Sequence, residues 1–149
     1  MAKLFAGIFV CIIPVLAMLE AGHNGPFAWL LAAVTAHDGS PHDVAYFWVT
    51  GLLSVFLDNA PTYLVLFQLA GGDAAKLMTD FSATLAAISM GAVYMGALTY
   101  IGNAPNFMVA AIANERGVKM PSFFGYMLWS FAALLPVLGL LTYVSIGAP

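Results

Sequence analysis

The stretch FLDNAPTYLVLF, residues 56–67, places an aspartate, an asparagine and a proline inside a long apolar run. A carboxylate is costly in an apolar environment, and a proline cannot continue a helix that has already begun. The same tripeptide, Asn-Ala-Pro, returns at residues 103–105, again at the end of an apolar run. These two interruptions therefore decide how the chain is threaded.

The composition is that of a membrane protein. Of 149 residues, 62% are hydrophobic and 7% are charged, whereas charged residues make up about 25% of a soluble domain. The net charge of -3 includes no basic cluster, so no nucleic-acid partner is expected. Cys11 is the only cysteine, which excludes an internal disulfide. We predict an all-α integral membrane protein, a single unit over residues 1–149 that crosses the inner or plasma membrane several times.

The apolar runs differ in length, and length decides which of them can cross a bilayer. Residues 4–19 with their flanks are just long enough, whereas residues 28–36 are too short and are expected to be interfacial or re-entrant. We expect about three transmembrane helices together with a re-entrant helical hairpin over residues 44–70, a discontinuous helix over residues 81–117 and a last span over residues 121–145.

The positive charges favour the hairpin over a kinked span across residues 44–70. With a hairpin, Lys3, Arg116 and Lys119 lie on the cytoplasmic side and Lys76 alone lies outside. A kinked span would divide the four charges equally. Because cytoplasmic loops carry the excess of lysine and arginine, the three-to-one division is preferred.

Asp58 is the only charge inside an apolar run, and carboxylates at membrane depth are usually functional. A proton and a metal cation could compete for it. Thr50 and Ser54 precede it at four-residue spacing, on one face of a helix. They could line a water path, although such hydroxyls often bond back to their own helix.

A proline leaves preceding carbonyls without donors, and broken helices place such groups at the binding sites of transporters. The alternative for a single proline is a simple kink. The candidate binding residues for a small ion or a small anionic substrate lie at the two interruptions: Asp58, Asn59, Thr62, Gly102, Asn103 and Asn106. A bound sodium ion would use Asp58, Asn59 and Asn103, and no other metal or cofactor is expected.

Two segments, GLLSVFLDNAPTYLVLFQLAGG (residues 51–72) and GALTYIGNAPNFMVAAIANERGVKMPSFFGYM (residues 96–127), resemble the C-terminal part of bacterial sodium:proton antiporter-like proteins. These belong to the ion transporter superfamily, beside arsenite permeases, citrate transporters and dicarboxylate/sodium symporters. The resemblance implies a hairpin with its tip at residues 58–62 and a helix broken at residues 102–106. In that superfamily both features line the substrate and sodium sites.

The resemblance further implies that this chain is one inverted-repeat half of a secondary transporter, with a second repeat or a partner subunit supplying the other half. The chain could also pair with itself as a homodimer. Dicarboxylate members carry Ser-Asn-Thr at the tip, whereas this chain carries Asp-Asn-Ala-Pro-Thr, which favours a member that handles cations.

Exchange of sodium for protons is therefore the first functional hypothesis. Within the same class, the alternative cargoes are a citrate-like carboxylate and arsenite. A scaffold or a truncated remnant that does not transport is a further alternative. An intramembrane aspartyl protease would need two aspartates at depth, and only Asp58 lies there, so the chain is not expected to be an enzyme.

Overall fold

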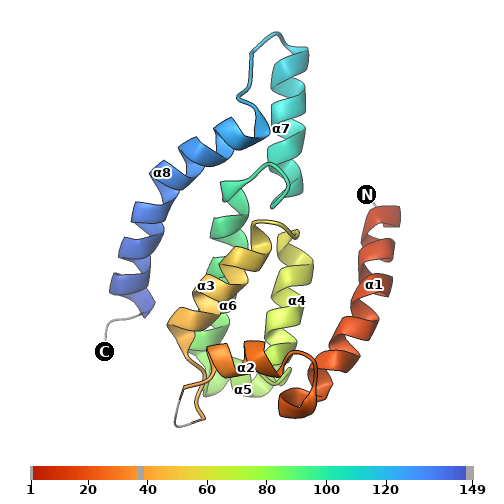
Figure 1. The fold of residues 1–149 in the computed structure, drawn as a ribbon, viewed down its shortest axis with the longest axis vertical. Coiled ribbons are helices and arrows are strands. Elements are labelled where there is room, and N and C mark those ends of the chain that lie inside the picture. Colours follow the sequence, from red (N-terminus) through yellow and green to blue (C-terminus); the bar gives the residue numbers. More distant parts are fainter. Residues whose placement is uncertain (1, 37–38, 147–149) are drawn as a thin grey trace.

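The computed structural model describes residues 2–36 and 39–146, and the regular elements of this part are helices (Figure 1). The all-α prediction is confirmed for these residues. The helices are α1 (Ala2–Glu20), α2 (Ala28–Val34), α3 (Asp43–Ser54), α4 (Asn59–Leu69), α5 (Ala74–Thr79), α6 (Ser82–Met95), α7 (Ala104–Glu115) and α8 (Phe123–Leu141). Short 3-10 turns follow α1 and α6, and a π turn extends α8 over Thr142–Ile146.

Helices α3 and α4 form an antiparallel pair joined by residues 55–58 (Figure 1). The helical hairpin predicted over residues 44–70 is present. Its arms have 12 and 11 residues, or about 18 and 16 Å at ~1.5 Å per residue. Neither arm could cross about 30 Å of hydrocarbon. That the hairpin enters and leaves the membrane on one side stays a prediction.

The tip of the hairpin lies slightly earlier in the chain than predicted. Residues 55–58 form the connection, and Pro61 is already the third residue of α4. Likewise Pro105 is in the first turn of α7, after the N-cap Asn103. First-turn N–H groups have no acceptor within their own helix, so proline is tolerated there. The prediction that these prolines free carbonyl groups is wrong, because each proline begins a helix and does not interrupt one.

The segment predicted as a discontinuous helix, residues 81–117, contains two helices, α6 and α7. That they form one broken membrane helix stays a prediction. A 3-10 turn over Gly96–Leu98 ends α6, and an irregular segment, residues 99–103, follows it. Helix α7 then continues in the same general direction, away from the bundle (Figure 1). The break at residues 102–106 was predicted a few residues too late, for the same reason as the hairpin tip.

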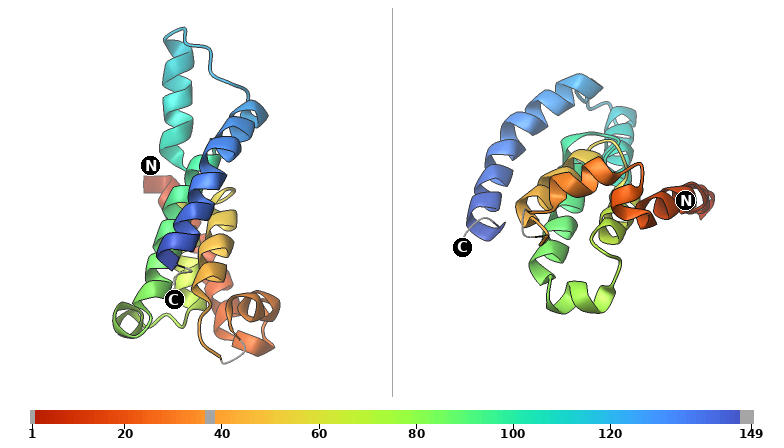
Figure 2. Two further views of the ribbon diagram at one scale, coloured as in Figure 1. Left: turned by 90° about the vertical axis from the view of Figure 1, so that its left-hand side faces the viewer. Right: turned by 60° about the horizontal axis from the view of Figure 1, so that its bottom comes forward.

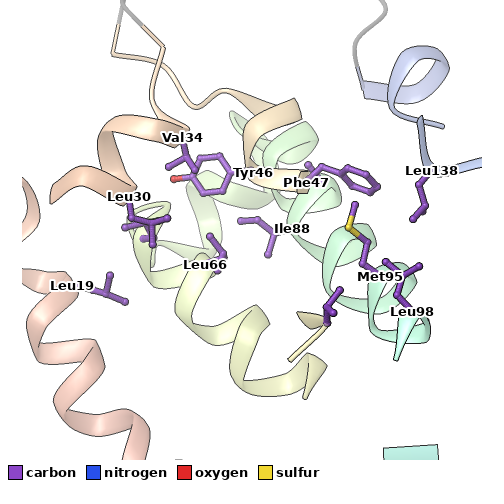
Figure 3. Close-up of a cluster of buried hydrophobic side chains, with 13 residues drawn as sticks. Leu19, Leu30, Val34, Tyr46, Phe47, Leu66, Ile88, Met95, Leu98 and Leu138 are labelled. Carbon is purple, nitrogen blue, oxygen red and sulfur yellow. The ribbon is translucent and has the colours of Figure 1, made fainter. Parts of the chain in front are cut away.

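Close packing of α3 against α6 forms the centre of the bundle, and these two helices make the most extensive contact in the described structure. A Cβ built at Gly91 would lie 2.5 Å from Phe47 O, so only glycine allows the two backbones to approach this closely. Phe47, Leu66, Ile88 and Met95 gather in the core between α3, α4 and α6 (Figure 3). The hairpin is therefore fixed directly against the first half of the broken helix.

Within the described residues, one helix is long and apolar enough to cross a membrane, Phe123–Ile146. Val10–Leu19 and Ser82–Leu98 are shorter apolar helices. Large apolar side chains are exposed on α7 and α8, among them Phe107 and Trp129. Such a surface is typical of contact with lipid or with another protein.

The connections between the helices gather at two opposite ends of the bundle, and which end faces the cytoplasm stays a prediction. Helices α2 and α5 lie across the end of the bundle where α3 begins and α4 ends, and the loop after α7 lies at the opposite end (Figures 1 and 2). Helix α5 was not predicted. Its N-cap, Asp73, accepts hydrogen bonds from the backbone N–H groups of Ala75 and Lys76. This polar local signal lies outside the apolar runs on which the prediction was based.

Candidate functional site

The hairpin connection and the break in the discontinuous helix lie against each other. Thr99 Oγ1 donates to Val55 O over 2.6 Å, and Gly102 N–H donates to the same hydroxyl over 2.9 Å. A Cβ at Gly102 would lie 2.6 Å from Ser54 O. The backbone of the break therefore touches the end of α3 directly, and Gly102 permits this contact.

The C-terminal end of α6 has its carbonyls satisfied by side chains from three other parts of the chain. The donor and acceptor pairs are Ser54 Oγ to Ala92 O (2.5 Å), Asn106 Nδ2 to Gly96 O (3.3 Å) and Thr99 O (3.1 Å), Tyr126 Oη to Ala97 O (2.9 Å), and Ser130 Oγ to Leu98 O (2.7 Å). Helix ends leave such carbonyls without intrahelical partners. Because donors from the protein already occupy them, this helix end is less available to a cation.

Tyr126 and Ser130 were not among the predicted site residues. Both lie on α8, and Tyr126 also stacks on Tyr100, with ring centroids 4.1 Å apart. Tyr100 in turn donates from its hydroxyl to Pro121 O over 3.2 Å. Both residues lie in the predicted last span, residues 121–145, and nothing local in the sequence pointed to the break as their partner.

The helices that begin at the two interruptions are not capped by side chains. Asp58 and Asn103 occupy the N-cap positions of α4 and α7 in extended backbone conformations. Both are residue types that usually cap helices, yet neither side chain makes a capping hydrogen bond. By contrast, Ser122 caps α8 in the usual way. The carboxylate and the amide are therefore not committed to their own helices.

The structure does not bring all six candidate binding residues into one pocket. Asp58 and Thr62 line a groove of about 780 Å³ between α1 and the hairpin. Asn59 lines a different groove, of about 530 Å³, between α4 and α6. Gly102, Asn103 and Asn106 line neither groove. Gly102 and Asn106 instead make the close contact and the hydrogen bonds that shape the break.

The hydroxyls of the predicted water path lie in the contact between α3 and α6. Thr50 and Ser54 are both fully buried and line neither groove. Ser54 donates to Ala92 O, whereas Thr50 Oγ1 is buried without a partner among the described residues. Thr62 Oγ1 bonds back to Asp58 O over 3.0 Å. The water path stays a prediction.

In the part of the chain that the structure describes, no three His, Cys, Asp or Glu side chains gather as metal ligands would. A sodium ion would have to use neutral oxygens beside Asp58. Asn59 faces another groove, and Asn103 lines neither groove. The sodium site at Asp58, Asn59 and Asn103 stays a prediction.

Helices that are interrupted near the membrane midplane form the binding sites of many secondary membrane transporters. The chain belongs to the family described as "Putative citrate transport", which matches residues 1–146. Comparisons with curated proteins and with solved structures give no match. Membership of this family indicates transport and a membrane location, and makes the chain a relative of the ion transporter superfamily.

Proposed function

We propose that this chain forms one half of a secondary transporter that carries a citrate-like carboxylate across the membrane. The observation that carries the proposal is the family match, which covers residues 1–146 of 149. It favours the carboxylate alternative over the exchange of sodium for protons that the tip sequence suggested.

The helix ends at the two interruptions support an anionic cargo. The positive ends of the helix dipoles of α4 and α7 lie at the hairpin tip and at the break, where they suit a carboxylate. Asn103 has an amide that makes no capping bond and can donate to such a group. The negative end of α6 is occupied by protein donors. The N-terminal ends of α4 and α7, which favour anions, are therefore more available to a bound molecule than the C-terminal end of α6.

Asp58 would repel a carboxylate cargo unless its own charge is neutralised. A proton or a sodium ion does this, so we assign Asp58 to the coupling of cargo to a cation gradient. Its carboxylate lines a largely apolar groove, where the charged form without a partner is costly. The same feature keeps sodium/proton exchange as the second candidate function.

The test is uptake of labelled citrate into proteoliposomes that contain the chain with its inverted partner repeat, under sodium and pH gradients imposed separately. We expect uptake driven by one of these gradients. Asp58→Asn should abolish the dependence on the gradient, whereas Asn103→Ala should raise KM and leave that dependence intact. Asp80→Asn, which removes the same charge from an exposed residue, is the matched control.

Three other outcomes would reject the proposal. Sodium/proton exchange without citrate uptake would restore the antiporter hypothesis, and arsenite uptake without citrate uptake would change the cargo. The absence of all three fluxes in correctly inserted protein would favour the scaffold.

A further inference from the structure

Thr99 is a fully buried residue of the break between α6 and α7, and its hydroxyl makes two hydrogen bonds. It donates to Val55 O in the hairpin connection over 2.6 Å and accepts from Gly102 N–H over 2.9 Å. A threonine hydroxyl has one proton to donate and two lone pairs that can accept. A single oxygen atom therefore joins the hairpin to the break.

The backbone of Thr99 extends this link to the first turn of α7. Thr99 O accepts from Asn106 Nδ2 over 3.1 Å, and the same nitrogen donates to Gly96 O over 3.3 Å. The N–H group of Asn106 donates to Asn103 O over 3.0 Å at the start of the helix. Thr99 thus connects the hairpin, the break and the N-terminal end of α7.

Packing within the described residues gives α7 little other support at this end. Helix α7 extends away from the bundle (Figure 1), and Ala110 is its buried residue. Phe107, Val109 and Ile112 are exposed. The segment that leads into α7, residues 99–103, has no regular secondary structure, and each of its residues has two soft dihedral angles. The hydrogen bonds at Thr99 are therefore what holds the start of α7 beside the hairpin.

We propose that Thr99 is a positioning residue of the cargo site. It holds the N-terminal end of α7 at a fixed distance from the hairpin tip, so that the N-terminal ends of α4 and α7 meet one cargo molecule together. The inference rests on the proposed function, in which these two helix ends receive the carboxylate. Thr99 is buried and lines neither groove beside the hairpin, so it acts through α7 and not by contact with the cargo.

The first measurement is the distance between the hairpin connection and α7, which needs no transport. Spin labels are attached to the cysteines of Phe56→Cys and Phe107→Cys, because both residues are exposed, in a Cys11→Ser background. Pulsed electron paramagnetic resonance of the full chain in lipid nanodiscs gives the distance distribution. Thr99→Val keeps the shape of the side chain but removes both hydroxyl bonds, so we expect the mean distance to shift and the distribution to widen. Thr99→Ser keeps the hydroxyl and should retain the original distribution.

Two further variants separate this link from a general loss of stability. Asn106→Leu breaks the link from the α7 side and should change the distribution as Thr99→Val does. Thr84→Val is the matched control, because Thr84 is also buried and donates to Asp43 Oδ1 over 2.5 Å. That bond joins α3 to α6 at the end of their contact remote from the break. Its loss should leave the distribution unchanged.

The second measurement is citrate uptake in the proteoliposomes described above. Thr99→Val should raise KM for citrate about three- to tenfold, the range expected for the loss of one hydrogen bond. The maximal rate should change less, by under about twofold, because the residue orients the site and does not touch the cargo. Thr99→Ser should restore KM, and Thr84→Val should not change it.

Several results would overturn the proposal. An unchanged distance distribution in either Thr99→Val or Asn106→Leu would mean that the link does not fix the position of α7. An equal change in Thr84→Val would mean that any loss at the contact between α3 and α6 has this effect. A changed distance with an unchanged KM would remove the role in cargo binding. Absence of citrate uptake by the unaltered protein would reject the proposed function instead, and the distance measurement would still decide whether Thr99 positions α7.

Discussion

Replacing Gly102 by alanine tests whether the break must touch the end of α3. The added Cβ would lie 2.6 Å from Ser54 O, 2.8 Å from Gly96 O and 3.1 Å from Thr99 Oγ1. Two of these atoms belong to the backbone of different elements, so no side-chain rotation relieves the contact. The hairpin end and the break must therefore move apart.

Two opposing contributions set the change in stability that Gly102→Ala causes. Overpacking of this kind costs about 1–3 kcal/mol, and the loss of glycine freedom in the unfolded chain offsets about 0.4–1 kcal/mol of it. We expect a net destabilisation of roughly 1–2 kcal/mol, or about 2–8 °C in the unfolding midpoint of a chain of this size.

Gly139→Ala is the matched control, since Gly139 lies inside α8 and nothing lies within 4 Å of its Cβ position. Alanine there should stabilise the helix by up to about 1 kcal/mol. The assay is thermal unfolding followed by tryptophan fluorescence in detergent. A thiol-reactive dye is unsuitable because Cys11 is exposed in the folded protein. Equal or higher stability of Gly102→Ala relative to Gly139→Ala would refute the close contact.

Three further predictions address threading and polar contacts. Single cysteines are placed at Asp43, Lys76 and Lys119 in a background without the native cysteine. An impermeant maleimide should label the first two from one side of the membrane and the third from the other side. Labelling of the first two from opposite sides would eliminate the hairpin. Thr50→Val should raise the free energy of unfolding by about 1 kcal/mol, because it removes a buried hydroxyl without a partner; a fall in citrate transport with unchanged stability would instead support the water path. Tyr126→Phe should destabilise the fold by about 1–3 kcal/mol by leaving Ala97 O unsatisfied, and an unchanged midpoint would contradict that.

Much of the fold could be predicted because its signals are local. The lengths of the apolar runs and the polar residues between them located α3, α4, α6, α7 and α8. The hairpin tip and the helix break both lie a few residues earlier in the chain than the sequence predicted. A proline pattern in sequence does not distinguish the interior of a helix from its first turn, where proline costs no hydrogen bond.

The candidate site was predicted less completely. Asp58 and Asn103 were chosen from residue type at the interruptions. Neither side chain caps its helix, and a binding role for them stays a prediction. Asn59 is adjacent to Asp58 in sequence but lines another groove. Successive residues on a helix point about 100° apart, and only the positions of α1 and α6 decide which groove each one meets.

The sequence by itself determined a helical membrane chain, its two interruptions and one carboxylate placed at the first of them. Only the tertiary structure decided which groups there are already satisfied. The hydrogen bonds that satisfy carbonyls at the end of α6 and in the 3-10 turn after it join Ser54 to Ala92, Tyr126 to Ala97 and Ser130 to Leu98, over separations of 38, 29 and 32 residues. Such pairs form because packing brings distant helices together, and no local propensity encodes which donor will meet which carbonyl.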